Sequence, residues 1–127
     1  MSKFTEQFKK TQQRAYEVNV GNGWWAERIL IRGALLWRGI DYKPHLAIEL
    51  LGLAGTEISE AIEAARKHDP STWRDSATKD TMVRECAGTI VRLMDLCEYL
   101  GLPLGEAIEK EIEENSKRGF KHGGKAA

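Results

Sequence analysis

The chain has 127 residues, which is the length of a single domain. Lys and Arg together number 19, as do Asp and Glu, so the formal net charge is zero. This balance argues against a protein that coats nucleic acid, and no stretch approaches the roughly 18 uninterrupted apolar residues of a membrane helix. The first ten residues contain no apolar segment typical of a secretory signal. We therefore expect a cytoplasmic protein with neither nucleic acid nor a membrane as its partner.

Apolar residues recur at helical spacing and no alternating β-branched run suggests a strand, so the sequence predicts an all-α fold. Helices are expected at about 2–18, 44–67, 79–100 and 103–117. The segment 26–37 is expected to be either a short helix or an ordered connection. Pro44 and Pro103 open helices, and Pro70 helps to stop one. Gly101 is expected to end its helix in a left-handed conformation.

Helices joined by short connections predict a four- to five-helix bundle, formed by one domain over residues 1–127 and completed by assembly into a homodimer or homotetramer. The expected core face of the helix at 44–67 comprises Ile48, Leu51, Ala54, Ile58, Ala61, Ile62 and Ala65. That of the helix at 79–100 comprises Met82, Val83, Cys86, Ile90, Leu93, Met94, Cys97 and Leu100. Trp37 and Trp73 are assigned to packing. From about residue 118 we expect a flexible, basic, Gly-rich tail.

Acidic residues interrupt these apolar patterns. Glu57 and Glu60 lie three residues apart, so both carboxylates can lean toward one point beside the helix. Glu85 lies in the corresponding part of the next long helix, and antiparallel packing of the two helices would bring all three together. Such a cluster needs a cation, and oxygen ligands of this kind suit Mg²⁺ or Mn²⁺. The alternative interpretation is three glutamates on the solvated faces of amphipathic helices.

Five short pieces extend this pattern along the chain. They are residues 23–25 (Gly-Trp-Trp), 56–66, 85–95, 100–104 and 115–125, the last with the spacing Asn-x-x-Arg-x-x-x-His-Gly-Gly-Lys. In order and spacing, these pieces resemble the all-α nucleoside triphosphate pyrophosphohydrolases, the MazG-like family. The resemblance covers about residues 20–125.

The resemblance implies hydrolysis of a nucleoside triphosphate, often a deoxynucleotide, to the monophosphate and pyrophosphate. It also implies Mg²⁺ held by an ExxE motif on one helix and an ExxD motif on the next, which assigns Glu57, Glu60 and Glu85 as metal ligands and catalytic residues. The sequence departs from the family at Gly88, where the motif has Asp. Asp95 cannot substitute, because it lies seven residues beyond Gly88 and about 10 Å further along the helix axis.

Further residues are candidates for substrate binding, each with a structural alternative. Trp24 and Trp25 are candidates to stack on a base, although one of two adjacent tryptophans is usually a core anchor. Arg92 is assigned either to the triphosphate or to a salt bridge across the bundle. The others are Asn19 for the base edge, and Asn115, Arg118, Lys121, His122 and Lys125 for the nucleotide and its phosphates. Asn115 could instead cap its helix, and the basic residues could form a solvated terminus.

Three functional hypotheses follow from the sequence. The first is a Mg²⁺-dependent nucleotide pyrophosphohydrolase that cleans the nucleotide pool. The second is a protein of the same fold that binds nucleotide but has lost turnover through Gly88. The third is a helical dimerisation module with incidental acidic residues.

Overall fold

The computed structural model describes residues 1–67 and 69–119. Its elements, in chain order, are α1 (Lys3–Gly21), α2 (Ala26–Trp37), α3 (Lys43–Arg66), α4 (Pro70–Arg74), α5 (Met82–Leu100) and α6 (Leu104–Lys117). The described residues form no strand, which confirms the all-α prediction. Among these helices, none combines the length and apolar character needed to span a membrane.

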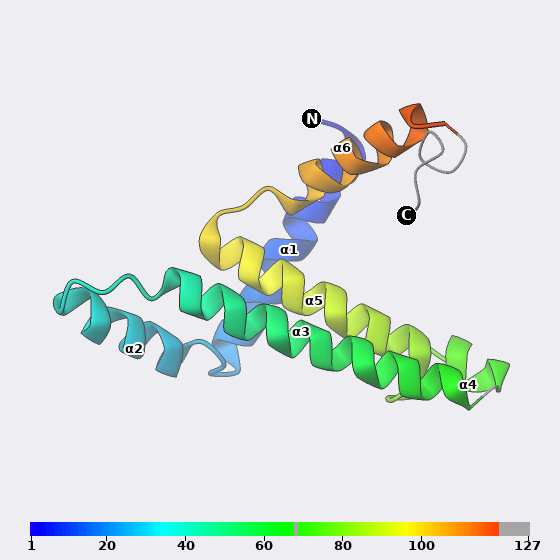
Figure 1. Ribbon diagram of the computed structural model, residues 1–127, viewed down its shortest axis with the longest axis horizontal. Coiled ribbons are helices and arrows are strands. Elements are labelled where there is room, and N and C mark those ends of the chain that lie inside the picture. The colour runs from blue at the N-terminus through cyan, green and yellow to red at the C-terminus, as the bar shows by residue number, and fades with distance from the viewer. Residues whose placement is uncertain (68, 120–127) are drawn as a thin grey trace.

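The frame of the molecule is a long antiparallel pair of helices, α3 and α5, joined by the short helix α4 and the turn after it (Figure 1). These two helices make the most extensive contact between any two elements. Helix α1 crosses α5, and α6 leaves the end of α5 to pack against α1. The antiparallel pair therefore sets side chains from the second half of α3 beside those from the first half of α5.

Local sequence explains where the helices begin and end. The hydroxyl of Thr81 accepts a hydrogen bond from the Arg84 backbone N–H, so α5 begins at Met82 rather than near residue 79. The preceding residue, Asp80, has a φ of 68°, a left-handed conformation that ends the turn leading into the helix. Gly101 closes α5 with a φ of 70°, as predicted. The short helix α4 lies between the predicted helices 44–67 and 79–100, in a segment for which no helix was predicted.

The core centres on Trp25, which is 1% exposed and packs with Leu46, Leu50 and Leu96. Its ring stacks on that of Tyr99 with 4.5 Å between centroids. Of the two adjacent tryptophans, Trp25 is therefore the core anchor.

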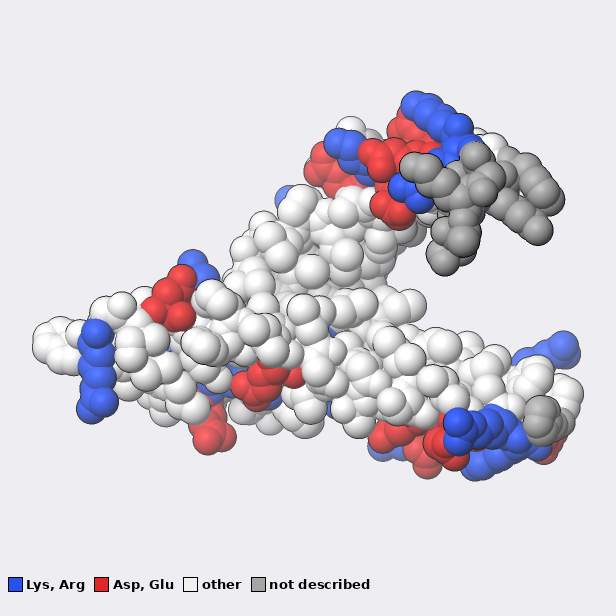
Figure 2. Space-filling view, viewed as in Figure 1, with Lys and Arg blue, Asp and Glu red and all other residues white. Residues whose placement is uncertain are grey.

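The predicted core face of α3 is largely wrong. Within the expected set Ala54 is buried, whereas four members are exposed: Ile48, Leu51, Ile58 and Ile62. Apolar residues occur on more than one face of α3. Only the face that packs against other helices of the same chain is buried. The face of the molecule in Figure 2 accordingly shows mainly uncharged side chains over the middle of this helix.

Three smaller predictions also need correction. Trp37, assigned to packing, is 92% exposed at the end of α2. Cys86, expected in the core, is exposed, and Cys97 is only partly buried. Val83 and Ile90 of the predicted α5 face are exposed as well, because α5 turns these positions away from α1 and α3.

Candidate metal centre

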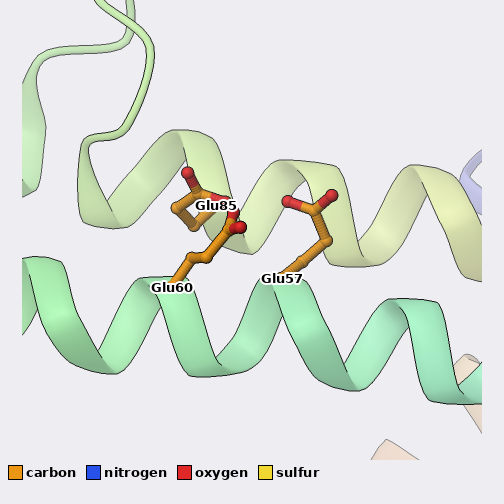
Figure 3. Close-up of side chains that lie close together, drawn as sticks. All are labelled: Glu57, Glu60 and Glu85. Atoms are coloured by element: carbon orange, nitrogen blue, oxygen red, sulfur yellow. The ribbon is translucent and has the colours of Figure 1, made fainter.

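Three glutamates meet between the two long helices. Glu57 and Glu60 project from α3, and Glu85 projects toward them from α5 (Figure 3). One carboxylate oxygen from each residue lies within 4.8 Å of the other two. Glu85 is only 7% exposed, Glu57 is partly buried and Glu60 is exposed. The antiparallel pairing of α3 and α5 thus brings together the three carboxylates that the sequence analysis singled out.

This donor set suits a small divalent cation. All three donors are carboxylates, which Mg²⁺ and Mn²⁺ prefer. Their oxygens are already close enough to share one ion, and the exposure of Glu60 leaves one side of the cluster open to solvent. Without a cation, three carboxylates at this separation repel one another.

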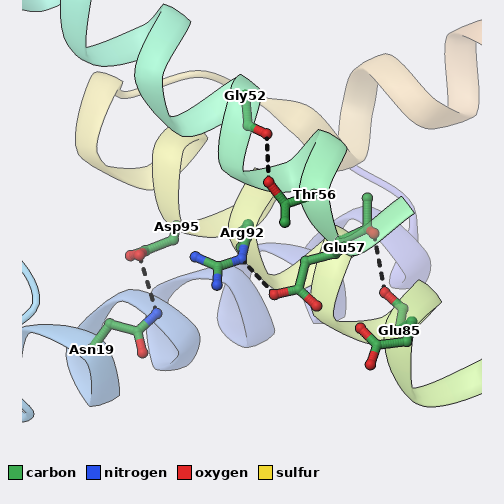
Figure 4. Close-up of polar contacts among 8 residues, drawn as sticks. Asn19, Gly52, Thr56, Glu57, Glu85, Arg92 and Asp95 are labelled. Carbon is green, nitrogen blue, oxygen red and sulfur yellow. Dashed lines mark hydrogen bonds and ion pairs between the residues drawn. The ribbon is translucent and has the colours of Figure 1, made fainter. Parts of the chain in front are cut away.

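Arg92 forms an ion pair with Glu57 of the cluster. Its Nε donates to Glu57 Oε1 over 2.9 Å (Figure 4). Both side chains are partly buried, and the guanidinium also lies 6.0 Å from the centre of the Trp24 ring. The salt bridge across the bundle is therefore present, and it holds Arg92 between the exposed tryptophan and the glutamates.

The structure explains why a glycine occupies position 88, which the sequence alone did not. A Cβ at this position would lie 3.0 Å from Glu57 Oε2 and 3.3 Å from its carboxyl carbon. The Glu57 side chain therefore rests directly on the backbone of α5 where a side chain would stand. Glycine permits this close approach, at a cost in helix propensity of about 1 kcal/mol.

The cluster shifts the pKa values of two of its carboxyl groups in opposite directions. The pKa of Glu85 rises from 4.5 to about 7. The largest cause is a hydrogen bond in which the protonated Glu85 carboxyl group donates to Glu57, followed by burial and by the nearby Glu60. The pKa of Glu57 falls, because the same hydrogen bond and then Arg92 stabilise its charged form, although burial opposes them.

These shifts predict that the metal-free protein loses stability as the pH rises through neutrality. Between about pH 4.5 and 7 the folded state holds a proton on Glu85 that the unfolded state has released, so the free energy of unfolding falls with pH. In the variant Glu85→Gln this dependence is removed. From about pH 5 to pH 8, we expect the melting temperature of the wild type, followed by circular dichroism in EDTA, to fall by about 4 °C or more relative to the variant. Parallel pH profiles would contradict this assignment.

Two pockets meet at the cluster. One, of about 210 Å³, is partly apolar, and its lining includes Trp24, Trp25, Leu50, Val91 and Arg92. The other, of about 310 Å³, is strongly charged, and its lining comprises Glu57, Glu60, Lys79, Asp80, Arg84, Glu85 and Gly88. Glu57 and Gly88 line both pockets, so these two residues mark the boundary between them.

The first pocket contains four of the predicted substrate-binding residues: Asn19, Trp24, Trp25 and Arg92. Trp24 is 54% exposed, whereas Trp25 is buried in the core behind the pocket. The amide of Asn19 donates to Asp95 over 3.0 Å, and Trp25 Nε1 donates to the same carboxylate over 2.8 Å. Asp95 thus orients the side chains of two pocket residues. Its carboxylate is engaged in these hydrogen bonds and does not belong to the glutamate cluster. Burial raises its pKa.

Two further predicted substrate-binding residues, Asn115 and Arg118, line neither pocket. Asn115 and Arg118 are exposed at the end of α6, the helix that packs against α1. Lys121, His122 and Lys125 lie outside the described residues. The basic tail expected from about residue 118 therefore has structural detail only through residue 119.

Sequence reasoning missed two cationic residues of the charged pocket, Lys79 and Arg84. They flank the start of α5, one on either side of the capping residue Thr81. A signal was present, because Arg84 is adjacent in sequence to Glu85. The turn that carries Lys79 depends on the left-handed conformation of Asp80, which the sequence pattern did not indicate.

Comparisons with protein-family models, with curated proteins and with solved structures found no match to this chain.

Proposed function

We propose that this protein is a Mg²⁺-dependent nucleoside triphosphate pyrophosphohydrolase that releases a nucleoside monophosphate and pyrophosphate and serves in cleaning the nucleotide pool. One observation carries the proposal: three carboxylates from two helices converge where an aromatic pocket meets a charged pocket. The MazG-like pattern of motifs in the sequence agrees with it. A helical dimerisation module would not need this juxtaposition.

The residues divide the work of this reaction among them. Glu57, Glu60 and Glu85 would hold Mg²⁺, which when bound neutralises phosphate charge and lowers the pKa of a coordinated water. Trp24 would stack on the base, and Arg92, which lies between Trp24 and Glu57, would bind a phosphate oxygen. A carboxylate of the cluster would accept the proton of the attacking water.

The test is a product assay with a panel of ribo- and deoxynucleoside triphosphates in the presence of Mg²⁺ or Mn²⁺. Monophosphate and pyrophosphate in equal amounts support the proposal, whereas diphosphate with phosphate contradicts it. The alternative is a nucleotide-binding protein without turnover, which the missing carboxylate at Gly88 favours. It predicts thermal stabilisation by nucleotide and metal without any product. A dimerisation module would respond to neither ligand.

We also propose that the protein assembles into a homodimer or homotetramer. The supporting observation is apolar surface on α2 and α3, where Leu30 is 74% exposed and Ile48 is 70% exposed, along with Trp37. Surfaces of this kind are usually covered by a partner. Leu30→Glu combined with Ile48→Glu is expected to lower the mass measured by light scattering to that of one chain, whereas the exposed control Gln13→Glu leaves it unchanged. A single-chain mass for the wild type would contradict the proposal.

A further inference from the structure

The charged pocket contains two cationic side chains that have no role in binding a metal ion at the glutamate cluster. Lys79 and Arg84 line the same pocket as the three glutamates. Among the described residues, neither forms an ion pair with any carboxylate. Arg84 instead donates to the backbone carbonyl of Ser76 over 3.0 Å, which anchors its guanidinium beside the pocket, and its charge also acts on the nearby carboxylate of Asp75.

We infer that Lys79 and Arg84 bind the β- and γ-phosphates of the substrate, and hence the departing pyrophosphate. This inference rests on the proposed function and gives the substrate a direction along the two pockets. The nucleoside and its α-phosphate occupy the pocket of Trp24 and Arg92, and the pyrophosphate part occupies the charged pocket.

The lining of the two pockets sets this direction. The first pocket has indole and aliphatic side chains that suit a base and a sugar. The second has no aromatic or aliphatic side chain in its lining, and it offers an ammonium and a guanidinium, both suited to phosphate oxygens. A nucleoside placed in the second pocket would find no aromatic side chain on which its base could stack.

In this orientation, the bond that breaks would lie at the boundary between the two pockets. Water adds to the α-phosphorus, the bond from that phosphorus to the oxygen bridging to the β-phosphate breaks, and pyrophosphate leaves with that oxygen. Glu57 and Gly88 line both pockets, so the bridging oxygen would lie beside the carboxylate cluster. At this boundary the Glu57 carboxylate rests against the backbone of Gly88.

The charge of the second pocket also predicts that the anion enters together with a cation. Four carboxylates line it, those of the cluster and Asp80, against the two cationic side chains. Free pyrophosphate would therefore be repelled, whereas pyrophosphate with Mn²⁺ supplies charges of both signs. Lys79 and Arg84 would then bind the pyrophosphate oxygens that the metal ion leaves free.

The test is isothermal titration of the full chain with two probes, pyrophosphate with Mn²⁺ and a nucleoside monophosphate with Mn²⁺. We expect Lys79→Gln combined with Arg84→Gln to weaken pyrophosphate binding at least about tenfold, the loss expected for charged hydrogen bonds, and to leave the monophosphate affinity unchanged. Trp24→Ala should weaken the monophosphate and spare pyrophosphate. The control Lys67→Gln with Arg74→Gln removes two exposed charges outside the pocket lining and should change neither affinity.

The double variant loses the contact of Arg84 with Ser76, which could unfold the turn. The single variant Lys79→Gln is therefore titrated as well. Within residues 1–67 and 69–119 the Lys79 side chain makes no hydrogen bond, so its loss should not disturb the fold. Equal weakening of both probes, no weakening of either, or a wild type that binds no pyrophosphate with Mn²⁺ would overturn the inference. Selective loss of pyrophosphate binding in a protein that hydrolyses no nucleotide would uphold it and reject the proposed function.

Discussion

Replacing Glu57 and Glu60 together by glutamine is expected to lower nucleoside triphosphate hydrolysis by at least about 10³-fold, or about 4 kcal/mol of transition-state stabilisation. The amides keep the size of the side chains but remove two of the three negative charges that would hold Mg²⁺. The comparison is the steady-state rate with saturating Mg²⁺. The fold should persist, because the substitutions also relieve repulsion within the cluster.

A matched control is available on the same helix. Glu63 is exposed, pairs with Arg66 over 2.7 Å and lies outside the cluster. Glu63→Gln should therefore retain the wild-type rate within about a factor of two, as expected for a surface substitution. If the double variant kept its activity while remaining folded, the three glutamates would not be the catalytic centre.

Gly88→Asp is expected to make the stability of the protein strongly dependent on divalent cations. The new Cβ would stand 3.0 Å from Glu57 Oε2, and the added carboxylate would be the fourth in the cluster. Without metal we expect the melting temperature to fall by about 4 °C or more. With Mg²⁺ or Mn²⁺ it should recover, and turnover should rise about tenfold, since the variant completes the ExxD motif.

Gly88→Asn is the control for this prediction, because it introduces the same Cβ contact with Glu57 and nearly the same volume without the charge. It should show neither the metal-dependent recovery nor the gain in turnover. If the Asp and Asn variants respond to metal alike, position 88 contributes no ligand. If the native protein turns over rapidly and Gly88→Asp adds nothing, the missing carboxylate is not a defect.

The long helices and the convergence of the glutamates could be predicted from sequence, because helix-forming patterns and the spacing of Glu57 and Glu60 are local and the chain then returns in an antiparallel helix. Pro44 favours the start of a helix and Gly101 favours the end of one, each through its own backbone preference. Spacing of three residues placed Glu57 and Glu60 on one side of α3, and a short connection forced the antiparallel neighbour that carries Glu85.

The parts that sequence could not predict depend on contacts between elements. Ile48 and Leu50 have similar hydrophobicity, yet only Leu50 faces the core, because the direction of packing decides which apolar stripe is covered. Gly88 looked unfavourable within its own helix, and its reason lies on the opposite helix in the Glu57 side chain. Lys79 reaches the charged pocket through the backbone turn at Asp80, a conformation that residue type alone rarely indicates.

The most direct measurement of the central claim is Mn²⁺ binding followed by electron paramagnetic resonance, with and without a nucleoside triphosphate analogue whose α–β bridge is methylene. We predict that the wild type binds Mn²⁺, that the analogue tightens this binding, and that Glu57→Gln combined with Glu60→Gln abolishes both effects. Mn²⁺ binding that is absent from the wild type, or unchanged in the double variant, would show that the three glutamates between α3 and α5 are not a metal centre.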